Sequence, residues 1–400
     1  MLNRSLIVHA LVGLVSLIAS AEVGCAMGVI DAEADAQSPA RTTEPAPSHR
    51  RDEQARDPLM PARTHEAAMA MAASLDGIVL FDVATSDVAA TATTTYPVED
   101  LAYDPWRDRW IVVEYEDASA NQVSVWRTVQ LDPDRIGLSR DSVIETGGYC
   151  RVAATRSGAV IFEDDGLHQR WLITGDDLAT LRQAIPTAIP SSLVVRESPF
   201  ASRLFGLVLR DQKADPTVSW SVHELDGQGL LAGSEEVLPA WSKHLSPPRI
   251  AAGRDGSFVV AQTQEPGVRI GVVDDSGQDI LPPVELAAAS ESAVEDVLVD
   301  RVTDTAFVLL SGANVLEVVH VQSPNERATV SVPGGVSPGS FWAMGRMMAL
   351  DEGTGTLLVG NNGAIVAFEL PETSGAAPER IGEWYGDAWR WPVVIASRGE

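Results

Sequence analysis

The sequence is poor in the residues that most often build metal and redox sites. It has 400 residues but only two cysteines, Cys25 and Cys150, and seven histidines. Two cysteines cannot form a disulfide framework or a four-cysteine zinc site. The chain also lacks the P-loop pattern and the G-x-G-x-x-G turn of dinucleotide-binding proteins. These absences argue against the common nucleotide-binding and cysteine-rich metalloprotein classes, and the sequence predicts no cofactor.

Basic residues are scarce as well. Lysine and arginine number 29 against 56 aspartate and glutamate residues, which gives a net charge of −27. Nucleic-acid backbones and anionic membrane surfaces both require cationic patches on their partners. The composition therefore excludes nucleic acid as the default partner, whereas cationic partners and divalent ions remain compatible with it.

The chain has no hydrophobic run long enough to span a bilayer. Its longest N-terminal run, Leu6 to Ile18, follows a single arginine and is typical of an export signal. Two cleavage sites compete. Ala19-Ser20-Ala21 suits ordinary signal peptidase, whereas Val23-Gly24-Cys25 resembles the end of a bacterial lipobox, although Glu22 replaces the usual aliphatic residue. Residues 1–25 are predicted to be a signal peptide, with lipidation of Cys25 favoured over free secretion.

Residues 26–66 are rich in alanine, proline and charge and contain few aromatic or β-branched residues. Such a composition cannot bury enough apolar surface to order itself. We therefore expect a disordered tether between the exported N-terminus and a folded region at 67–400. The only membrane contact predicted is an N-terminal lipid anchor, which places the protein in the outer membrane or periplasm as a lipoprotein, or outside the cell.

A strand-turn-strand pattern returns about every 50 residues, and this period is typical of repeat architectures. Each copy has an acidic or polar turn followed by an aromatic residue, leucine or alanine that opens a valine-rich strand. The six copies lie at 101–114, 151–164, 193–209, 249–263, 297–311 and 347–361. A third apolar segment and a short fourth one usually follow, so each repeat predicts a four-stranded antiparallel blade.

The two ends of the chain predict how the ring closes. Residues 70–83 match the second and third strands of the last full repeat, and residues 391–400 match an innermost strand with its turn. We therefore expect an all-β, seven-bladed β-propeller in which the C-terminal strand joins three N-terminal strands, with six or eight blades as alternatives. The one segment with helical character is 176–184.

The hairpin motif resembles that of the broad YVTN, NHL and SMP-30-like group of β-propellers. Residues 300–308 (DRVTDTAFV) and 351–359 (DEGTGTLLV) carry it best, and the resemblance covers nearly all of residues 67–400. The chain lacks the Gly-His and Trp-Asp pairs of WD40 repeats and the regular glycine pairs of kelch repeats, and no specific family is matched. The resemblance implies the fold and leaves the activity open.

Charged residues at the start of predicted innermost strands are the candidate site. They are Glu99, Asp100, Arg249, Glu295 and Asp296, which would face the mouth of the central channel if the strand assignment is right. Paired carboxylates there could hold a calcium ion or act as acid and base, although channel-lining, solvated side chains are the simpler interpretation.

Two functions fit these features. The favoured hypothesis is a non-enzymatic module of the bacterial cell envelope that binds another envelope or extracellular protein, or a glycan, because a flexible tether from a membrane helps a binding module most. The alternative is a propeller hydrolase or lactonase that uses a divalent cation, calcium above all, and carboxylates such as Glu99 and Glu295 at the channel mouth. A structural envelope component is a third possibility.

Overall fold

The computed structural model describes residues 69–398, apart from gaps at 75–76, 86, 116–120, 133–134, 147–148, 165–168, 175–180, 187–189, 198–201, 211–216, 227–228, 238–247, 265–266, 287–291, 335, 337–345, 362–363 and 386–394. The predicted signal peptide (1–25), the lipidation site Cys25 and the tether (26–66) lie outside the described residues, so these stay predictions. In the described part, no helix is long and apolar enough to cross a membrane.

All regular elements in the described ranges are β-strands, and they form seven four-stranded antiparallel sheets. Each sheet is named here by its innermost strand. The β28 sheet joins the two ends of the chain and has the order β28 (Ile395–Ser397), β1 (Met69–Ser74), β2 (Gly77–Asp82), β3 (Val88–Thr93). The β4 sheet comprises β4 (Val98–Asp104), β5 (Arg109–Tyr115), β6 (Asn121–Asp132) and β7 (Arg135–Thr146).

The five remaining sheets follow in chain order. The β8 sheet comprises β8 (Tyr149–Thr155), β9 (Gly158–Asp164), β10 (Gln169–Thr174) and β11 (Leu181–Pro186). The β12 sheet comprises β12 (Pro190–Glu197), β13 (Ser202–Arg210), β14 (Thr217–Asp226) and β15 (Gly229–Val237). The β16 sheet comprises β16 (Arg249–Ala252), β17 (Phe258–Gln264), β18 (Gly267–Val273) and β19 (Asp279–Leu286). The β20 sheet comprises β20 (Val294–Asp300), β21 (Thr305–Leu310), β22 (Val315–His320) and β23 (Arg327–Ser331), and the β24 sheet comprises β24 (Met348–Asp351), β25 (Thr356–Gly360), β26 (Ala364–Glu369) and β27 (Glu379–Tyr385).

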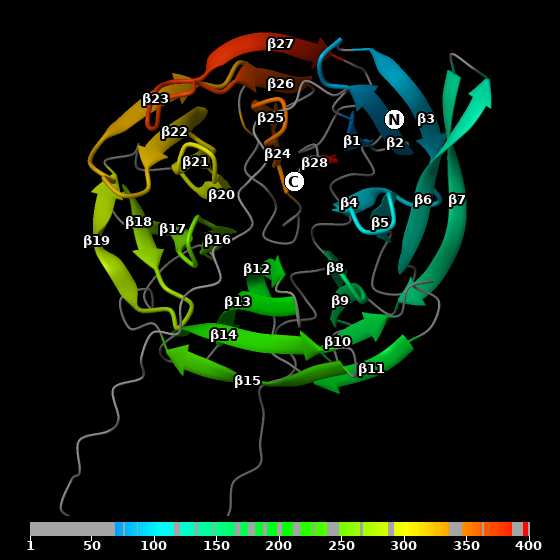
Figure 1. Cartoon of the computed structure of the whole chain (residues 1–400), viewed down its shortest axis with the longest axis horizontal. Coiled ribbons are helices and arrows are strands. Elements are labelled where there is room, and N and C mark those ends of the chain that lie inside the picture. Colours follow the sequence, from blue (N-terminus) through cyan, green and yellow to red (C-terminus); the bar gives the residue numbers. More distant parts are fainter. Residues whose placement is uncertain are drawn as a thin grey trace, which may run out of the picture. The chain divides into compact units, whose positions relative to one another are not determined.

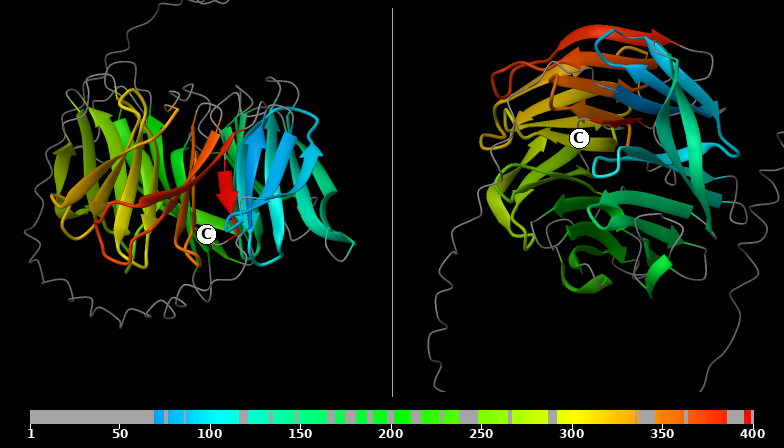
Figure 2. Two further views of the ribbon diagram at one scale, coloured as in Figure 1. Left: turned by 90° about the horizontal axis from the view of Figure 1, so that it is seen from above. Right: turned by 45° about the vertical axis from the view of Figure 1, so that its right-hand side comes forward.

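The sheets surround a common axis as the blades of a β-propeller (Figure 1). Neighbouring innermost strands contact one another in the order β4, β8, β12, β16, β20, β24, β28 and β4 again. The edge-on view shows the blades side by side around the disc (Figure 2). The predicted all-β fold with four-stranded antiparallel blades is confirmed.

The C-terminal strand β28 pairs with β1, with Ile395 opposite Ala72 and Ser397 opposite Ala70. The blade that starts the chain therefore receives its innermost strand from the other end of the chain, as the matching segments predicted. The helical character of 176–184 is wrong for its last four residues, because Leu181 to Ala184 belong to strand β11 and pair with β10. Cross-strand pairing overrides the local helix propensity of leucine, glutamine and alanine.

Apolar side chains fill the wedges between neighbouring sheets. Strand β21 shows the pattern: Phe307 and Leu309 pack toward the β24 sheet, whereas Ala306, Val308 and Leu310 pack toward the β16 sheet. Successive residues of a strand face opposite sides, so a strand covered on both sides is apolar throughout. This is why the second strand of each repeat is a continuous valine- and leucine-rich run.

The turn between the first two strands of a blade explains the acidic residue of the repeat motif. Oδ1 of Asp300 accepts the N–H of Val302, and Oδ1 of Asp351 accepts the N–H of Thr354. Asp304 has a φ of 54° and Gly355 a φ of 70° in the same hairpins. Aspartate and glycine tolerate this left-handed conformation, and an aspartate side chain caps such a turn. The repeat motif therefore stabilises the turn between the first two strands, and the turn sets the register of these strands.

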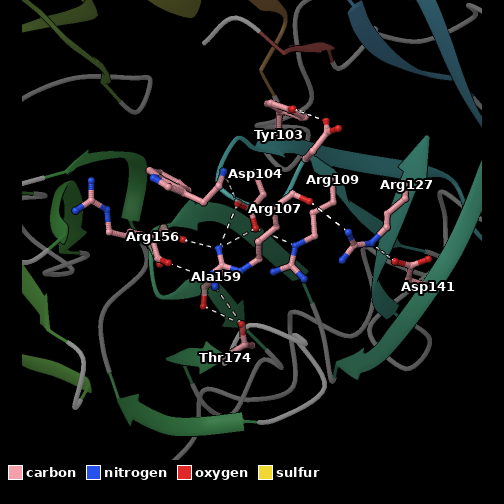
Figure 3. Close-up of polar contacts among 12 residues, drawn as sticks. Tyr103, Asp104, Arg107, Arg109, Arg127, Asp141, Arg156, Ala159 and Thr174 are labelled. Carbon is pink, nitrogen blue, oxygen red and sulfur yellow. Dashed lines mark hydrogen bonds and ion pairs between the residues drawn. The ribbon is translucent and has the colours of Figure 1, made fainter. Parts of the chain in front are cut away.

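Arginines at the turns between the first and second strands link one blade to the next. Nη2 of Arg107, in the β4–β5 turn, donates to the carbonyl of Arg156 in the neighbouring sheet at 2.7 Å, and its Nη1 also bonds Asp104 (Figure 3). Arg301 makes a bidentate pair with Glu352 of the β24 sheet at 2.9 and 3.0 Å. These contacts lie at the turn ends of the innermost strands, opposite the strand starts where Glu99 and Glu295 lie.

Candidate active site at the starts of the innermost strands

Two Glu-Asp pairs occupy matching positions at the starts of β4 and β20. In β4 the pairing register shifts between Val98 and Asp100, and in β20 it shifts between Val294 and Asp296. Glu99 and Glu295 are therefore the extra residues of two β-bulges. Bulges re-aim side chains and are frequent beside functional sites. The sequence placed both pairs at the starts of innermost strands, and the structure puts them there.

The aspartate of each pair is buried and ties its strand to the next blade. Oδ2 of Asp100 accepts the N–H of Val152 on β8 at 3.1 Å. Oδ2 of Asp296 accepts the N–H groups of Met347 and Met348, at the start of β24, at 2.8 and 2.9 Å. The other oxygen of each carboxylate accepts the N–H of the following residue in its own strand. Both aspartates thus act as links between blades.

Three arginines surround these aspartates. Desolvation by burial raises the pKa of Asp100, and the charges of Arg151 and Arg346 act against that rise. Burial also raises the pKa of Asp296, which Arg249 and Arg346 counteract. Arg346 precedes β24 and acts on both aspartates, so the two Glu-Asp pairs share one electrostatic environment. Of the three arginines, Arg151 and Arg249 are buried and Arg346 is exposed.

The two glutamates differ although their backbone positions match. Glu295 is buried, and its Oε1 accepts a hydrogen bond from the hydroxyl of Ser311 at 2.5 Å. The position equivalent to Ser311 is Tyr115, because Ser311 and Tyr115 each donate their N–H to the residue before the bulged strand, Ala293 and Pro97 respectively. Tyrosine has no hydroxyl close to its backbone, so Glu99 lacks the clamp that holds Glu295.

Glu99 is the titratable group with the chemistry of an acid or a base. It is half-buried, and burial, with a smaller contribution from the charge of Asp100, raises its pKa from the ordinary 4.5 to about 7. A carboxyl group that exchanges its proton near neutrality can both accept and return a proton within one reaction cycle. Among the five residues that the sequence singled out, Glu99 is therefore the one suited to proton transfer.

The calcium alternative stays a prediction, and two of the candidate carboxylates already have other partners. In the described part of the chain, no three or more His, Cys, Asp or Glu side chains are arranged to hold a metal ion. The oxygens of Asp100 and Asp296 already accept backbone N–H groups, and their neighbours are arginines. Calcium needs six to eight oxygen ligands free to coordinate it. Three arginines therefore accompany four carboxylates at the starts of these strands.

Sequence reasoning missed Arg151, Arg346 and Ser311. Arg151 follows Cys150 in the start of β8, the position that Asp100 holds in β4, so the repeat alignment contained the signal. Arg346 precedes its strand, five residues before Asp351, as Glu99 precedes Asp104 and Glu295 precedes Asp300, so the repeat alignment contained this signal too. Cys150 is buried in β8, as expected of a structural thiol.

Two large aromatic residues, Trp110 and Trp384, pack as wedges between blades, whereas Trp106 is exposed. Trp110 is fully buried with its ring 4.7 Å from that of Tyr103, and Trp384 of the β24 sheet lies 5.1 Å from Phe81 of the β28 sheet. These rings fill the core between blades and do not form a recognition surface.

One short pattern resembles a hydrolase nucleophile motif. Residues 335–339 (GVSPG) have the G-x-S-x-G spacing. That motif requires a strand leading through a sharp turn into a helix. Here it follows strand β23, no helix occurs among the described residues, and of the five residues only Val336 is described. The motif therefore lies almost entirely outside the described residues.

No protein-family model matches the chain, and no curated protein matches it. Several solved structures are similar. A functionally unknown protein from Desulfotomaculum acetoxidans has a TM-score of 0.57 at 17% identity, covering 82% of this chain and 98% of its own. The periplasmic gluconolactonase PpgL of Pseudomonas aeruginosa has a TM-score of 0.55 at 15% identity, covering 83% and 99%. Apo AztD from Citrobacter koseri has a TM-score of 0.52 at 13% identity, covering 83% and 99%. At these identities the likeness shows the fold alone, a β-propeller.

Proposed function

We propose that the protein binds a small organic acid or its lactone at the starts of the innermost strands and hydrolyses the lactone with Glu99 as the proton-transfer residue. The observation that carries the proposal is the contrast between two matching bulges, in which Glu295 is clamped by Ser311 and Glu99 is not. The name of the similar Pseudomonas aeruginosa gluconolactonase supports the substrate class.

The residues divide the work as follows. Glu99, deprotonated, takes a proton from a water molecule as its oxygen attacks the lactone carbonyl carbon. Negative charge then develops on the carbonyl oxygen, where the exposed guanidinium of Arg346 can stabilise it. The bond between that carbon and the ring oxygen breaks, and the ring oxygen receives the proton from Glu99. The product is a hydroxy acid, and no step needs a metal ion.

The blades supply the rigidity that such a site requires. We infer a closed ring of seven blades, with β28 on β1 as its closing pair, because each innermost strand contacts the next around the axis. A closed ring has no free inner edge that could let the two bulges move apart. Asp100 and Asp296 add hydrogen bonds between blades directly beside the glutamates.

The test is the hydrolysis of glucono-1,5-lactone and a panel of aldonic lactones, followed with a pH indicator and corrected for spontaneous hydrolysis. We expect the wild-type protein to accelerate the reaction in the presence of EDTA, and Glu99→Gln to lose the acceleration. Glu295→Gln is the matched control, with the same substitution in the equivalent bulge. Absence of acceleration with every lactone, or full activity of Glu99→Gln, would overturn the proposal.

The proposal also includes where in the cell the protein is located. We propose that the protein is exported and anchored through lipidated Cys25, and the similarity in fold to a periplasmic gluconolactonase agrees with export. Labelling with a palmitate analogue in bacteria expressing the full chain tests the anchor. Loss of label in Cys25→Ser is expected, and cleavage after Ala21 with no label would establish free secretion instead.

The envelope-binding role that the tether favours makes a different prediction. A binding module captures one envelope protein or glycan whether or not Glu99 is intact. Capture experiments with the wild-type protein and Glu99→Gln therefore separate the two functions. One partner enriched equally by both proteins, together with no lactone hydrolysis, would favour the binding module.

A further inference from the structure

A fully buried carboxylate, Glu114, lies at the end of β5 and holds the segment that leads into β4. Its Oε2 accepts the N–H groups of Thr95 and Tyr96 at 2.7 and 3.3 Å. The next residue in β5, Tyr115, donates its N–H to the carbonyl of Pro97 at 2.8 Å. Every residue from 95 to 97 is thus fixed to the end of β5, directly before the bulge at Glu99.

The remaining hydrogen bonds of Glu114 come from the two outer strands of the same sheet. Gln122 and Ser124 of β6 donate to it at 2.6 and 2.5 Å, and Nη2 of Arg140 on β7 donates at 3.0 Å. Nη1 of Arg140 also donates to the hydroxyl of Thr95 at 3.1 Å. Three strands of the blade, β5, β6 and β7, therefore hold the segment that precedes Glu99, directly or through Glu114.

The β20 sheet has no carboxylate at the position equivalent to Glu114. Val98 pairs with Glu114 in the β4 sheet, and Val294 pairs with Leu310 in the β20 sheet, so Leu310 stands where Glu114 does. Leu310 is fully buried in the apolar core. A buried carboxylate is costly and is usually no more stabilising than an apolar side chain of similar size. Fold stability alone therefore does not require Glu114.

We infer that Glu114 is a positioning residue, which fixes the segment before β4 and thereby the aim of the Glu99 side chain. The inference rests on the proposed function of Glu99. Its basis is a coincidence of two features in the β4 sheet: Glu99 has no serine hydroxyl to hold it, and the hydrogen-bond network of Glu114 holds the segment before it. In the β20 sheet, Ser311 holds Glu295 directly, and an apolar residue suffices behind it.

The test compares Glu114→Gln with Asp104→Asn. Asp104 is also fully buried in the β4 sheet and forms an ion pair with Arg109 at 2.8 Å, but it lies at the turn end of β4. Both substitutions remove a buried charge from the same blade. Glu114→Gln is expected to disturb Glu99, and Asp104→Asn is not. Ser124→Ala removes one hydrogen bond to Glu114 and serves as a milder variant if Glu114→Gln does not fold.

The first measurement is the titration of the Glu99 carboxyl carbon by NMR, assigned with Glu99→Gln, which needs no substrate. Loosening the segment admits water, so we expect the pKa of Glu99 to fall from about 7 toward its ordinary value in Glu114→Gln and, less, in Ser124→Ala. Asp104→Asn is expected to leave the titration unchanged. An unchanged Glu99 titration in folded Glu114→Gln or Ser124→Ala would overturn the inference.

The second measurement is the pH profile of lactone hydrolysis. We expect kcat to fall about tenfold in Glu114→Gln with a smaller change in KM, since misaligned catalytic groups lose rate more than binding. If the wild-type protein hydrolyses no lactone but the Glu99 titration still shifts in Glu114→Gln, the proposed function fails and the positioning role stands. If hydrolysis is present and neither the profile nor the titration changes, the positioning role fails alone.

Discussion

The β4 and β20 blades start with the same local sequence, Val-Glu-Asp, and the same bulge. Their glutamates nevertheless differ in burial and in hydrogen bonding. In the β20 blade Glu295 is buried under the hydroxyl of Ser311, with Leu310 behind it. In the β4 blade Glu99 is half-buried, Tyr115 stands at the position of Ser311, and Glu114 stands at the position of Leu310. One motif can therefore be structural in one blade and chemically available in another, according to two neighbouring residues of the second strand.

The largest effect is expected from breaking the links between blades. Asp296→Ala leaves two cross-blade N–H groups without an acceptor, and Asp100→Ala leaves one. We expect losses of about 3 and about 2 kcal/mol in unfolding free energy, since each buried donor left unpaired costs about 1–3 kcal/mol. Urea denaturation measures both. Asp275→Ala, at an exposed position, should change stability by less than about 0.5 kcal/mol. An equal loss for Asp100→Ala and Asp275→Ala would contradict the linking role.

The next effect concerns the chemistry of the two glutamates. Glu99→Gln should lower kcat for lactone hydrolysis by about 100-fold or more, the usual contribution of a general acid or base. Glu295→Gln should lower it by less than about threefold, because Ser311 holds that side chain away from the reaction. Steady-state kinetics at pH 7 on both variants measures this difference. Similar losses from the two variants would make the bulges equivalent.

Exchanging the clamp tests the comparison directly. Tyr115→Ser gives the β4 blade the residue of the β20 blade, and a hydroxyl that donates to the charged carboxylate favours ionisation. The pKa of Glu99 should therefore fall below about 7 in carboxyl NMR titration. Tyr115→Ala removes the ring without adding a hydroxyl, so the difference between the two variants isolates the clamp. A smaller fall in Tyr115→Ser than in Tyr115→Ala would be the contrary result.

The smallest effect is on the pH dependence of stability. Because the pKa of Glu99 is raised from 4.5 to about 7, the folded state keeps a proton that the unfolded state has released between these values. Stability should therefore fall as pH rises from 4.5 to 7, by about 1 kcal/mol after allowance for solvent screening. Urea unfolding at several pH values gives the free energy of unfolding as a function of pH. Between pH 4.5 and 7 this free energy should fall less steeply with pH in Glu99→Gln than in the wild type. Identical slopes would mean that Glu99 titrates alike in both states.

The repeat period and the strand pattern were enough to predict the all-β fold and the four-stranded antiparallel blades. They were also enough to predict that residues 395–397 join the N-terminal strands, because this segment matches an innermost strand and the N-terminal segment matches the strands that follow one. The position of the two Glu-Asp pairs at strand starts followed from the same alignment. The segment 176–184 misled because its composition favours a helix, whereas pairing with β10 makes its end a strand.

The sequence by itself determined which residues stand at the starts of the innermost strands, since the repeat orders them along the chain. Only the tertiary structure decided what each of them does. The role of Glu99 depends on its burial, on the charge of Asp100 and on Tyr115 standing where the other blade has a serine, and the role of Asp296 depends on the start of the next blade. The charge of Arg346 lowers the pKa of both Asp100 and Asp296. These aspartates belong to different blades, far apart in the chain, that the ring brings around one axis. Burial and electrostatic contacts between blades are properties of the assembled ring, and no local pattern encodes them.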